Sequence, residues 1–177
     1  MERRIVIAGF GGQGVLTLGQ IVSLMAMEVD LNVTWIPSYG AEMRGGTANC
    51  AVIISDKKIG SPIVNDKIDI LIAMNAPSLQ KFVGLVQTGG SVIVNKSIIN
   101  SIFDNADKFI YEVNATDIAL RIGDIRCANI VVLGALCKIV NELDLSLAKR
   151  IVAKKFVKKC ELLKLNELAL FEGFQSI

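Results

Sequence analysis

Short apolar runs alternate along the chain with longer stretches in which apolar residues recur at helical spacing. Runs such as residues 5–8, 51–54 and 69–73 are typical of strands that are buried on both faces of a sheet. The strands predicted in this way are residues 3–8, 32–37, 47–55, 69–73, 91–95 and 108–113, with a turn and a short edge strand at 57–63.

The stretches between these runs predict helices. They cover residues 14–28, 75–86, 116–122, 129–143 and 147–164, and an apolar tail follows them. Thr116 and Asp117 are expected to cap the third helix, and capping is the first role expected of Asn129. Since strands alternate with helices and no long linker intervenes, we predict a single α/β domain over residues 1–177. It should be a three-layer α/β/α, Rossmann-like fold with a largely parallel sheet and a short edge hairpin, and residues 145–177 should form a helical C-terminal part.

Hydrophobic residues make up 52% of the 177 positions and glycine adds 15 more, an apolar share above the level of about 45–50% that is usual in soluble domains. A membrane, a deeply buried sheet or an extensive partner interface could explain it. A spanning helix needs about 20 apolar residues, and the best runs, 15–27 and 130–136, are interrupted or too short. The first residues lack the long apolar segment and cleavage site of a signal peptide. We therefore expect a cytoplasmic protein that self-associates, for instance as a homodimer, when it is isolated from its partners.

The composition excludes several kinds of chemistry. The chain has no histidine, which excludes a Ser-His-Asp triad, a Cys-His pair and His-ligated zinc. The cysteines form no C-x-x-C pair and match no zinc or iron–sulfur spacing; they are Cys50, Cys127, Cys137 and Cys160. We expect reduced core or interface thiols, no catalytic residue and no metal bound by this chain. A net charge of +2 and 6% aromatic residues argue against nucleic acid.

A glycine pattern, Gly9-x-Gly11-x-x-Gly14, follows the first strand and opens the first helix, which is the context of a dinucleotide-binding turn. A helix N-terminus there would attract anions. An NAD site also needs an acid at the end of the second strand, but Glu28 and Asp30 both precede that strand. Three interpretations stay open: glycines that only permit a crossover, a bound NAD(P) or flavin, and an amide-rich edge that meets a ligand of a partner. The candidate residues of this loop are Gly9, Gly11, Gly12, Gln13 and Gly14.

The segment 38–50 follows the second strand and should lie beside the glycine loop, because ligands and partners meet open α/β sheets at that edge. It mixes an aromatic ring, both charges, hydroxyls and paired glycines. The alternative is a polar turn with a surface pair between Glu42 and Arg44, which would add little stability. The candidates here are Ser38, Tyr39, Glu42, Arg44, Gly45 and Gly46, to which Asn129 is added as a capping or interface residue.

Three segments together resemble the gamma subunit of 2-oxoacid:ferredoxin (acceptor) oxidoreductases, most of all the 2-oxoglutarate and 2-ketoisovalerate type. They read Gly-Phe-Gly-Gly-Gln-Gly-Val at 9–15, Thr-Trp-Ile-Pro-Ser-Tyr-Gly at 34–40 and Glu-Met-Arg-Gly-Gly-Thr-Ala-Asn-Cys at 42–50. Similar motifs at 59–62, 75–77, 126–129 and 133–135 extend the resemblance over about residues 3–140. Ala41 stands where related sequences lead us to expect proline, and the C-terminal helices match only in character.

The resemblance implies a complex that decarboxylates a 2-oxoacid on thiamine diphosphate with Mg, passes electrons through [4Fe-4S] clusters to ferredoxin and forms an acyl-CoA. The thiamine would lie between alpha and beta subunits, and the clusters in beta or delta chains. This chain would scaffold the catalytic subunits and shape the approach of CoA, with Arg44 and the amides of the glycine loop contacting phosphates or a neighbouring subunit.

The stretch 147–164 carries seven Lys or Arg against one Glu. It is either a solvated helix face or a surface that docks an acidic subunit or ferredoxin. The apolar tail after it either folds back onto the core or docks on a partner. Two other functions remain as alternatives: a stand-alone NAD(P)- or flavin-binding oxidoreductase, and a plain homo-oligomeric binding module.

Overall fold

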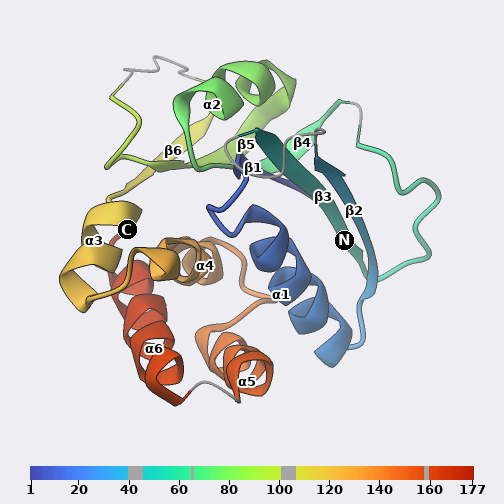
Figure 1. Ribbon diagram of the computed structural model, residues 1–177. Helices are drawn as coiled ribbons and strands as arrows, with labels where there is room; N and C mark the ends of the chain where they lie inside the picture. The colour runs from blue at the N-terminus through green and yellow to red at the C-terminus, as the bar shows by residue number, and fades with distance from the viewer. Residues whose placement is uncertain (40–45, 65, 101–106, 158–159) are drawn as a thin grey trace.

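The computed structural model describes residues 1–39, 46–64, 66–100, 107–157 and 160–177. Within them, six strands form one sheet in the order β2-β3-β1-β4-β5-β6 (Figure 1). The strands are β1 (Glu2–Phe10), β2 (Asn32–Tyr39), β3 (Thr47–Ser55), β4 (Ile68–Ala73), β5 (Val86–Asn95) and β6 (Phe109–Val113). β1, β4, β5 and β6 pair in parallel, whereas β3 runs antiparallel to both of its neighbours. The α/β class and the largely parallel sheet are confirmed, and the edge hairpin consists of β2 and β3.

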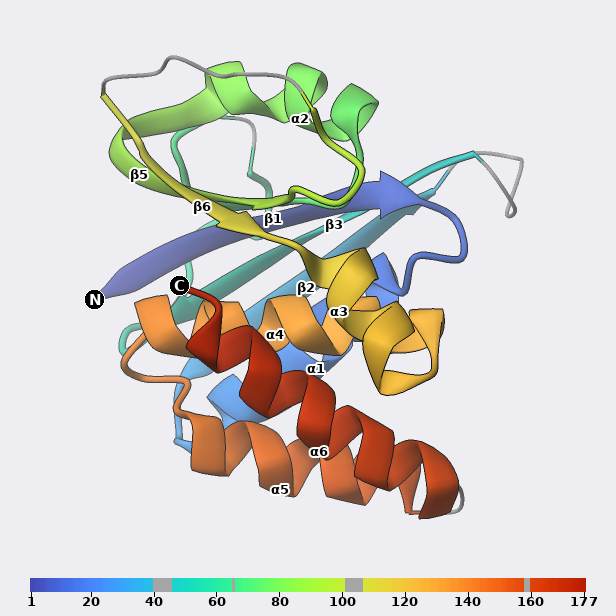
Figure 2. The ribbon, with the colours of Figure 1, turned by 90° about the vertical axis from the view of Figure 1, so that its left-hand side faces the viewer.

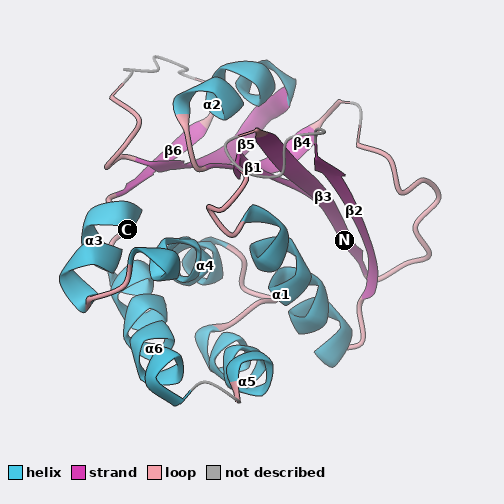
Figure 3. Cartoon of the chain, in the orientation of Figure 1, coloured by secondary structure: helices cyan, strands magenta, loops and turns pink. Residues whose placement is uncertain are grey.

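Helices cover both faces of the sheet, as Figure 3 shows by colour. They are α1 (Val15–Glu28), α2 (Ala76–Phe82), α3 (Ala115–Ile122), α4 (Ala128–Ile139), α5 (Leu145–Phe156) and α6 (Cys160–Gln175), with short 3₁₀ turns η1 (Val83–Leu85) and η2 (Ile125–Cys127). α2 lies on one face, and α1 and α4 lie on the other (Figure 1). In Figure 2, α5 and α6 lie on the far side of α1 and α4 from the sheet, so they form a further layer of helices there.

The sheet separates two apolar cores, because side chains alternate between its faces. Ile5 and Ile72 point toward α1 and α4, whereas Val6 and Leu71 belong to the smaller core under α2. All four residues are at least 96% buried. Strands that are buried on both faces therefore account for part of the high apolar content of the chain.

The predicted helix at 147–164 is wrong, because two helices occupy that stretch: α5 ends at Phe156 and α6 begins at Cys160. Each helix buries its own apolar stripe, Ile151 and Val152 in α5 and Ala169 and Leu170 in α6. One straight helix could not bring both stripes onto the core. The apolar tail lies within α6, which packs against α4, so of the two alternatives the structure shows the tail folded back onto the core.

Other boundaries shift for local reasons. The described residues between 56 and 64 contain no strand, so the edge strand predicted at 57–63 is wrong, and β2 forms that edge instead. The second predicted helix ends earlier, and β5 begins at Val86, where a register shift against β4 accommodates the extra residues. The third helix has Asn114 at its N-cap position, so the cap predicted at Thr116 and Asp117 is wrong. α4 ends at Ile139, four residues before the predicted end.

α4 and α6 approach each other closely through two glycines. A Cβ atom on Gly134 of α4 would overlap the backbone of Leu170, and one on Gly173 of α6 would overlap the backbone of Val131. Both contacts involve backbone atoms, which cannot move aside as a flexible side chain can. The two glycines therefore set the spacing of the helix pair that carries the C-terminal part of the fold.

Candidate functional site

The glycine loop connects β1 to α1 at the carboxyl edge of the sheet. Gly12 and Gly14 have φ angles of 100° and 72°, a left-handed conformation that favours glycine. Gly14 is the N-cap residue of α1, and no side chain within the described residues caps this helix. The first turn of α1 therefore offers backbone N–H groups and the positive end of the helix dipole at this edge.

Gln13 holds the loop in place. Its Oε1 accepts a hydrogen bond from the Phe10 backbone N–H at 2.7 Å and one from the Asn75 amide at 3.3 Å. Its Nε2 donates to the Met74 carbonyl at 3.1 Å. Asn75 in turn caps α2, where its Oδ1 accepts from the Ser78 N–H at 2.9 Å. The side-chain amide that the sequence suggested for a ligand thus fastens the loop to the end of β4.

Asn129 is 95% buried and lies across the start of α1. Its Nδ2 donates to the Gly14 carbonyl at 3.2 Å. The N-cap position of α4 is Cys127, so the capping role predicted for Asn129 is wrong. A Cβ on Gly14 would lie 2.7 Å from the Asn129 Cγ. Gly14 therefore serves both the left-handed turn and the close approach of α4.

The loop stands at a switch point of the topology. β1 and β4 are neighbours, yet α1 after β1 covers one face and α2 after β4 covers the other (Figure 1). Open α/β sheets bind ligands in the crevice that forms at such a point. A hollow of about 160 Å³ lies there, lined by Gly12, Gln13, Met74, Ile98, Thr116, Ile125, Arg126 and Ala128.

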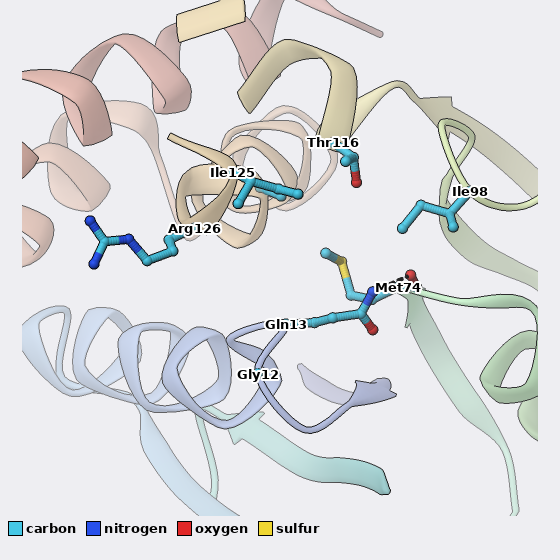
Figure 4. Close-up of a pocket in the computed structure, with 8 residues that line it drawn as sticks. Gly12, Gln13, Met74, Ile98, Thr116, Ile125 and Arg126 are labelled. Carbon is cyan, nitrogen blue, oxygen red and sulfur yellow. Dashed lines mark hydrogen bonds between the residues drawn. The ribbon is translucent and has the colours of Figure 1, made fainter. Parts of the chain in front are cut away.

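This first hollow is mainly apolar. Figure 4 shows Met74, Ile98 and Ile125 pointing toward one another across it, with the Thr116 hydroxyl on one side. Thr116 is fixed by Asn95, whose Nδ2 donates to its Oγ1 at 2.8 Å. The hollow suits an apolar portion of a ligand or an apolar side chain of a partner.

A second hollow of about 230 Å³ lies beside the N-terminus of α1 and shares Gly12 and Arg126 with the first. Its lining is more polar and includes Gly14, Thr17, Asn129 and Asn166, closed by Cys127, Phe156 and Leu162. Asn166, on α6, is only 3% exposed. The α1 N-terminus, one guanidinium and two side-chain amides surround this space, and such groups bind anions.

Arg126 stands at the boundary of the two hollows and is paired with Asp124. Its Nε lies 3.0 Å from both carboxylate oxygens, and its Nη2 lies 2.6 Å from Oδ2. Asp124 also caps η2, since its Oδ1 accepts from the Arg126 backbone N–H at 2.9 Å. The hydrogen bonds from Arg126 hold the pKa of the Asp124 carboxyl below its usual value.

The hairpin β2–β3 reaches the same edge. The Gly11 N–H donates to the Gly46 carbonyl at 2.9 Å, so the prediction that this segment lies beside the glycine loop holds for Gly46. Ser38 pairs with Asn49 in the ladder and is exposed. Glu42, Arg44 and Gly45 lie outside the described residues, as does the side chain of Tyr39. Their predicted roles stay predictions.

The sequence prediction for the site missed Asp124, Arg126, Thr17 and Asn166. Two local signals were present: Arg126 begins the motif at 126–129 that forms part of the family resemblance, and a charged Asp-x-Arg step directly precedes a strongly apolar helix. Asn166 gave none, because it lies in the tail far from the glycine loop along the chain. The structure brings together Gly12, Gly14 and Asn129 around the second hollow. Gly9 does not line it; a Cβ placed on Gly9 would lie 2.9 Å from the Cβ of Met74.

The described cysteines are buried thiols. Burial raises the pKa of Cys50 to about 11 and that of Cys137 to about 12, and Cys127 is buried as well. The side chain of Cys160 lies outside the described residues. Within the described part of the chain, no three His, Cys, Asp or Glu side chains are grouped as metal ligands would be.

None of the described helices is both long and apolar enough to cross a membrane.

Comparison with known proteins gives a family match over almost the whole chain. A family model described as pyruvate ferredoxin/flavodoxin oxidoreductase matches residues 4–176. The ketoisovalerate oxidoreductase subunit VorA of Methanothermobacter thermautotrophicus is 41% identical over 135 residues, which are 76% of this chain and 28% of VorA. The 2-oxoglutarate synthase subunit KorC of Methanocaldococcus jannaschii is 31% identical over 180 residues, covering 99% of this chain and 94% of KorC. The chain thus spans less than a third of VorA but nearly all of KorC.

Two solved structures show the same fold. The 2-oxoglutarate:ferredoxin oxidoreductase of Magnetococcus marinus, solved with 2-oxoglutarate, coenzyme A and succinyl-CoA bound, has a TM-score of 0.89 and 25% identity. That match covers 98% of this chain and 30% of the solved one. The gamma subunit of a keto/oxoacid ferredoxin oxidoreductase from Geobacter sulfurreducens has a TM-score of 0.84 and 26% identity, with 98% and 97% of the two chains covered.

Proposed function

The chain belongs to the pyruvate ferredoxin/flavodoxin oxidoreductase family, and from this premise we propose that it is the gamma-type subunit of a 2-oxoacid:ferredoxin oxidoreductase. The proposal rests on one observation: the chain matches two subunits of such enzymes over almost their whole length. KorC and the solved gamma subunit are covered over 94% and 97% of their lengths, whereas the same unit is a smaller part of VorA. The region that matches this chain is thus nearly a whole protein in KorC and a part of a longer protein in VorA. The partners proposed for this chain are alpha and beta subunits, with a delta subunit where one exists, and ferredoxin through the complex.

We favour 2-oxoglutarate as the substrate of the complex, which would decarboxylate it oxidatively to an acyl-CoA. The relative that the chain covers almost completely is a 2-oxoglutarate synthase subunit, although the more identical VorA is a ketoisovalerate subunit. The buried polar residues of the described part of the chain are serines and asparagines, with no buried acid or base that would recognise the substrate. In this proposal, other chains therefore determine which oxoacid is used.

The role proposed for this chain in the reaction lies on the CoA side. A CoA molecule carries phosphate groups and a thiol, and the thiol takes the acyl group when CoA is bound. The second hollow fits a phosphate, because Arg126 and the N-terminus of α1 are positive and the buried Asn166 lines the space. The first hollow, lined by Met74, Ile98 and Ile125, fits an apolar portion of the same ligand. In this proposal the chain binds and orients CoA and does no proton transfer.

Thiamine diphosphate, Mg and [4Fe-4S] clusters are assigned by this proposal to the partner subunits. The described thiols do not fit cluster ligation, because Cys50, Cys127 and Cys137 are buried separately and Cys50 and Cys137 have raised pKa values. Ligation requires accessible thiolates in a shared pocket.

Purification of the native complex through a tag on this chain, without oxygen, tests the proposed function. We expect partners that carry thiamine and iron–sulfur clusters, and CoA-dependent reduction of ferredoxin with one of a panel of 2-oxoacids, 2-oxoglutarate first. Omission of CoA should stop the acyl-CoA product. A chain that is recovered alone, with no oxoacid-dependent activity in the same extract, would contradict the proposal.

The glycine loop also supports a second candidate, a stand-alone NAD(P)- or flavin-binding oxidoreductase. The strand β2 ends with Ser38 and Tyr39, where an NAD site needs an acid. A thermal shift of the purified chain with NAD, FAD or CoA separates the two functions. A large shift with NAD or FAD and none with CoA would favour the second.

A further inference from the structure

We infer that Asp124 is a positioning residue, which holds the Arg126 guanidinium in the orientation that binds a phosphate group at the second hollow. The inference rests on the proposed function, since CoA is the phosphate-bearing ligand considered there. It goes beyond that function by assigning a specific task to an acidic residue beside an anion site, where an acid would ordinarily repel the ligand.

The pair has a side-on geometry. Asp124 contacts the Nε and Nη2 atoms of Arg126, at distances of 2.6–3.0 Å. A guanidinium has five N–H donors, so this contact leaves both N–H groups of Nη1 and one of Nη2 free. These free groups form the end of the fork that matches two oxygens of a phosphate.

The backbone fixes the carboxylate itself. Asp124 caps η2 through the Arg126 N–H, and its side chain is 13% exposed, whereas that of Arg126 is 71% exposed. The buried partner thus restrains the exposed one. Arginine loses much rotamer freedom when it binds a ligand, and restraint before binding removes part of that cost.

The restrained guanidinium lies where a ligand would need it. Arg126 lines both hollows, and Figure 4 shows it directed away from Gln13 and Met74, toward the side of α1. The second hollow, which Arg126 also lines, contains Asn166, and this residue is 97% buried. A side-chain amide in the wall of a hollow can donate to or accept from a polar ligand there.

Asp124 also carries a negative charge that opposes an incoming anion. That effect is weakened because the Arg126 guanidinium beside it carries the opposite charge and, being 71% exposed, leaves the pair open to screening by salt. At physiological ionic strength we therefore expect the positioning effect to exceed the repulsion.

Isothermal titration of the full chain with CoA, 3′,5′-ADP and inorganic phosphate tests the inference. Asp124→Asn keeps an oxygen for the η2 cap but loses the charged clamp, and we expect it to weaken CoA binding by about 3–10-fold. Arg126→Ala should weaken it at least as much, and Asp124→Asn in the Arg126→Ala background should then have no further effect. A purely structural role of Asp124 would leave its effect intact in that background.

The matched control is Glu172→Gln, which breaks a similar exposed pair with Arg121 and should leave CoA binding unchanged. Binding of CoA and 3′,5′-ADP but not of inorganic phosphate would identify the nucleotide as the phosphate source. If wild-type protein binds CoA and Asp124→Asn binds it equally or more tightly, the inference is wrong while the proposed function stands. If wild-type protein binds none of the three probes, the inference and the CoA role proposed for this chain both fail, while its assignment as a subunit is tested separately by purification of the complex.

Discussion

Gly14 combines two constraints that have different origins. The left-handed backbone at φ 72° belongs to the turn itself, and the sequence pattern indicates it. The contact with Asn129, 115 positions away, comes from the packing of α4 against the loop. Gly12 has only the first constraint, because no described atom would lie within 4 Å of a Cβ placed there.

This difference predicts unequal effects of two similar substitutions. Gly14→Ala should lower the free energy of unfolding by about 3 kcal/mol, since it adds a steric overlap to backbone strain. Gly12→Ala should cost about 1 kcal/mol from strain alone. Urea denaturation followed by circular dichroism measures both. Equal losses would show that the contact with Asn129 does not constrain the loop.

At the scale of elements, the helix pair α4–α6 carries the C-terminal part of the fold. α4 is buried on most sides, since every residue from Ala128 to Cys137 is buried. α6 supplies the cover and also brings Asn166 to the second hollow. The spacing of the pair therefore affects both the stability of the chain and the shape of the candidate site.

Gly134→Ala tests this spacing. The added methyl group would meet the backbone of Leu170 and lie 2.8 Å from the Phe174 nitrogen, so we expect a loss of about 2–3 kcal/mol in the free energy of unfolding. Gly84→Ala is the control, because no described atom lies within 4 Å of its Cβ position. It should change stability by less than about 0.5 kcal/mol. A neutral Gly134→Ala would mean that the helices can separate without cost.

At the scale of the whole molecule, large apolar side chains remain on the surface at several places. They include Met27 at 58% exposed, Phe109 at 61%, Leu120 at 57% and Ile125 at 54%. Single exposed apolar residues are ordinary, but Ile125 flanks the first hollow at the ligand-binding edge of the sheet. A subunit whose surface is partly interior in a complex would leave such groups uncovered when it is alone.

The isolated chain is therefore predicted to self-associate. Sedimentation velocity over a concentration series should show a dimer or a larger species at micromolar concentration. Association with the proposed partner subunits should replace this self-association, so the purified complex serves as the comparison. A chain that stays monomeric throughout the series would contradict the prediction.

The sequence by itself determined the elements that depend on local pattern. Continuous apolar runs identified β1 and β4, and helical periodicity identified α1 and α4. The glycine spacing identified the turn between β1 and α1, because positive φ angles are a property of the residue itself. The motifs at 9–15, 34–40 and 42–50 also indicated the family, because no single structural role would require all of these residues together.

Tertiary structure alone decided how these elements meet. The break between α5 and α6, the antiparallel direction of β3 and the bond from Asn129 to Gly14 all depend on contacts between distant parts of the chain. The two hollows exist because α3, α4 and α6 converge on the glycine loop. Periodicity indicates which face of a helix or strand is apolar. A single sequence does not say which other helix or strand will pack against that face. For this reason the glycine loop could be predicted from the residues, whereas the position of Asp124, Arg126 and Asn166 beside it could not.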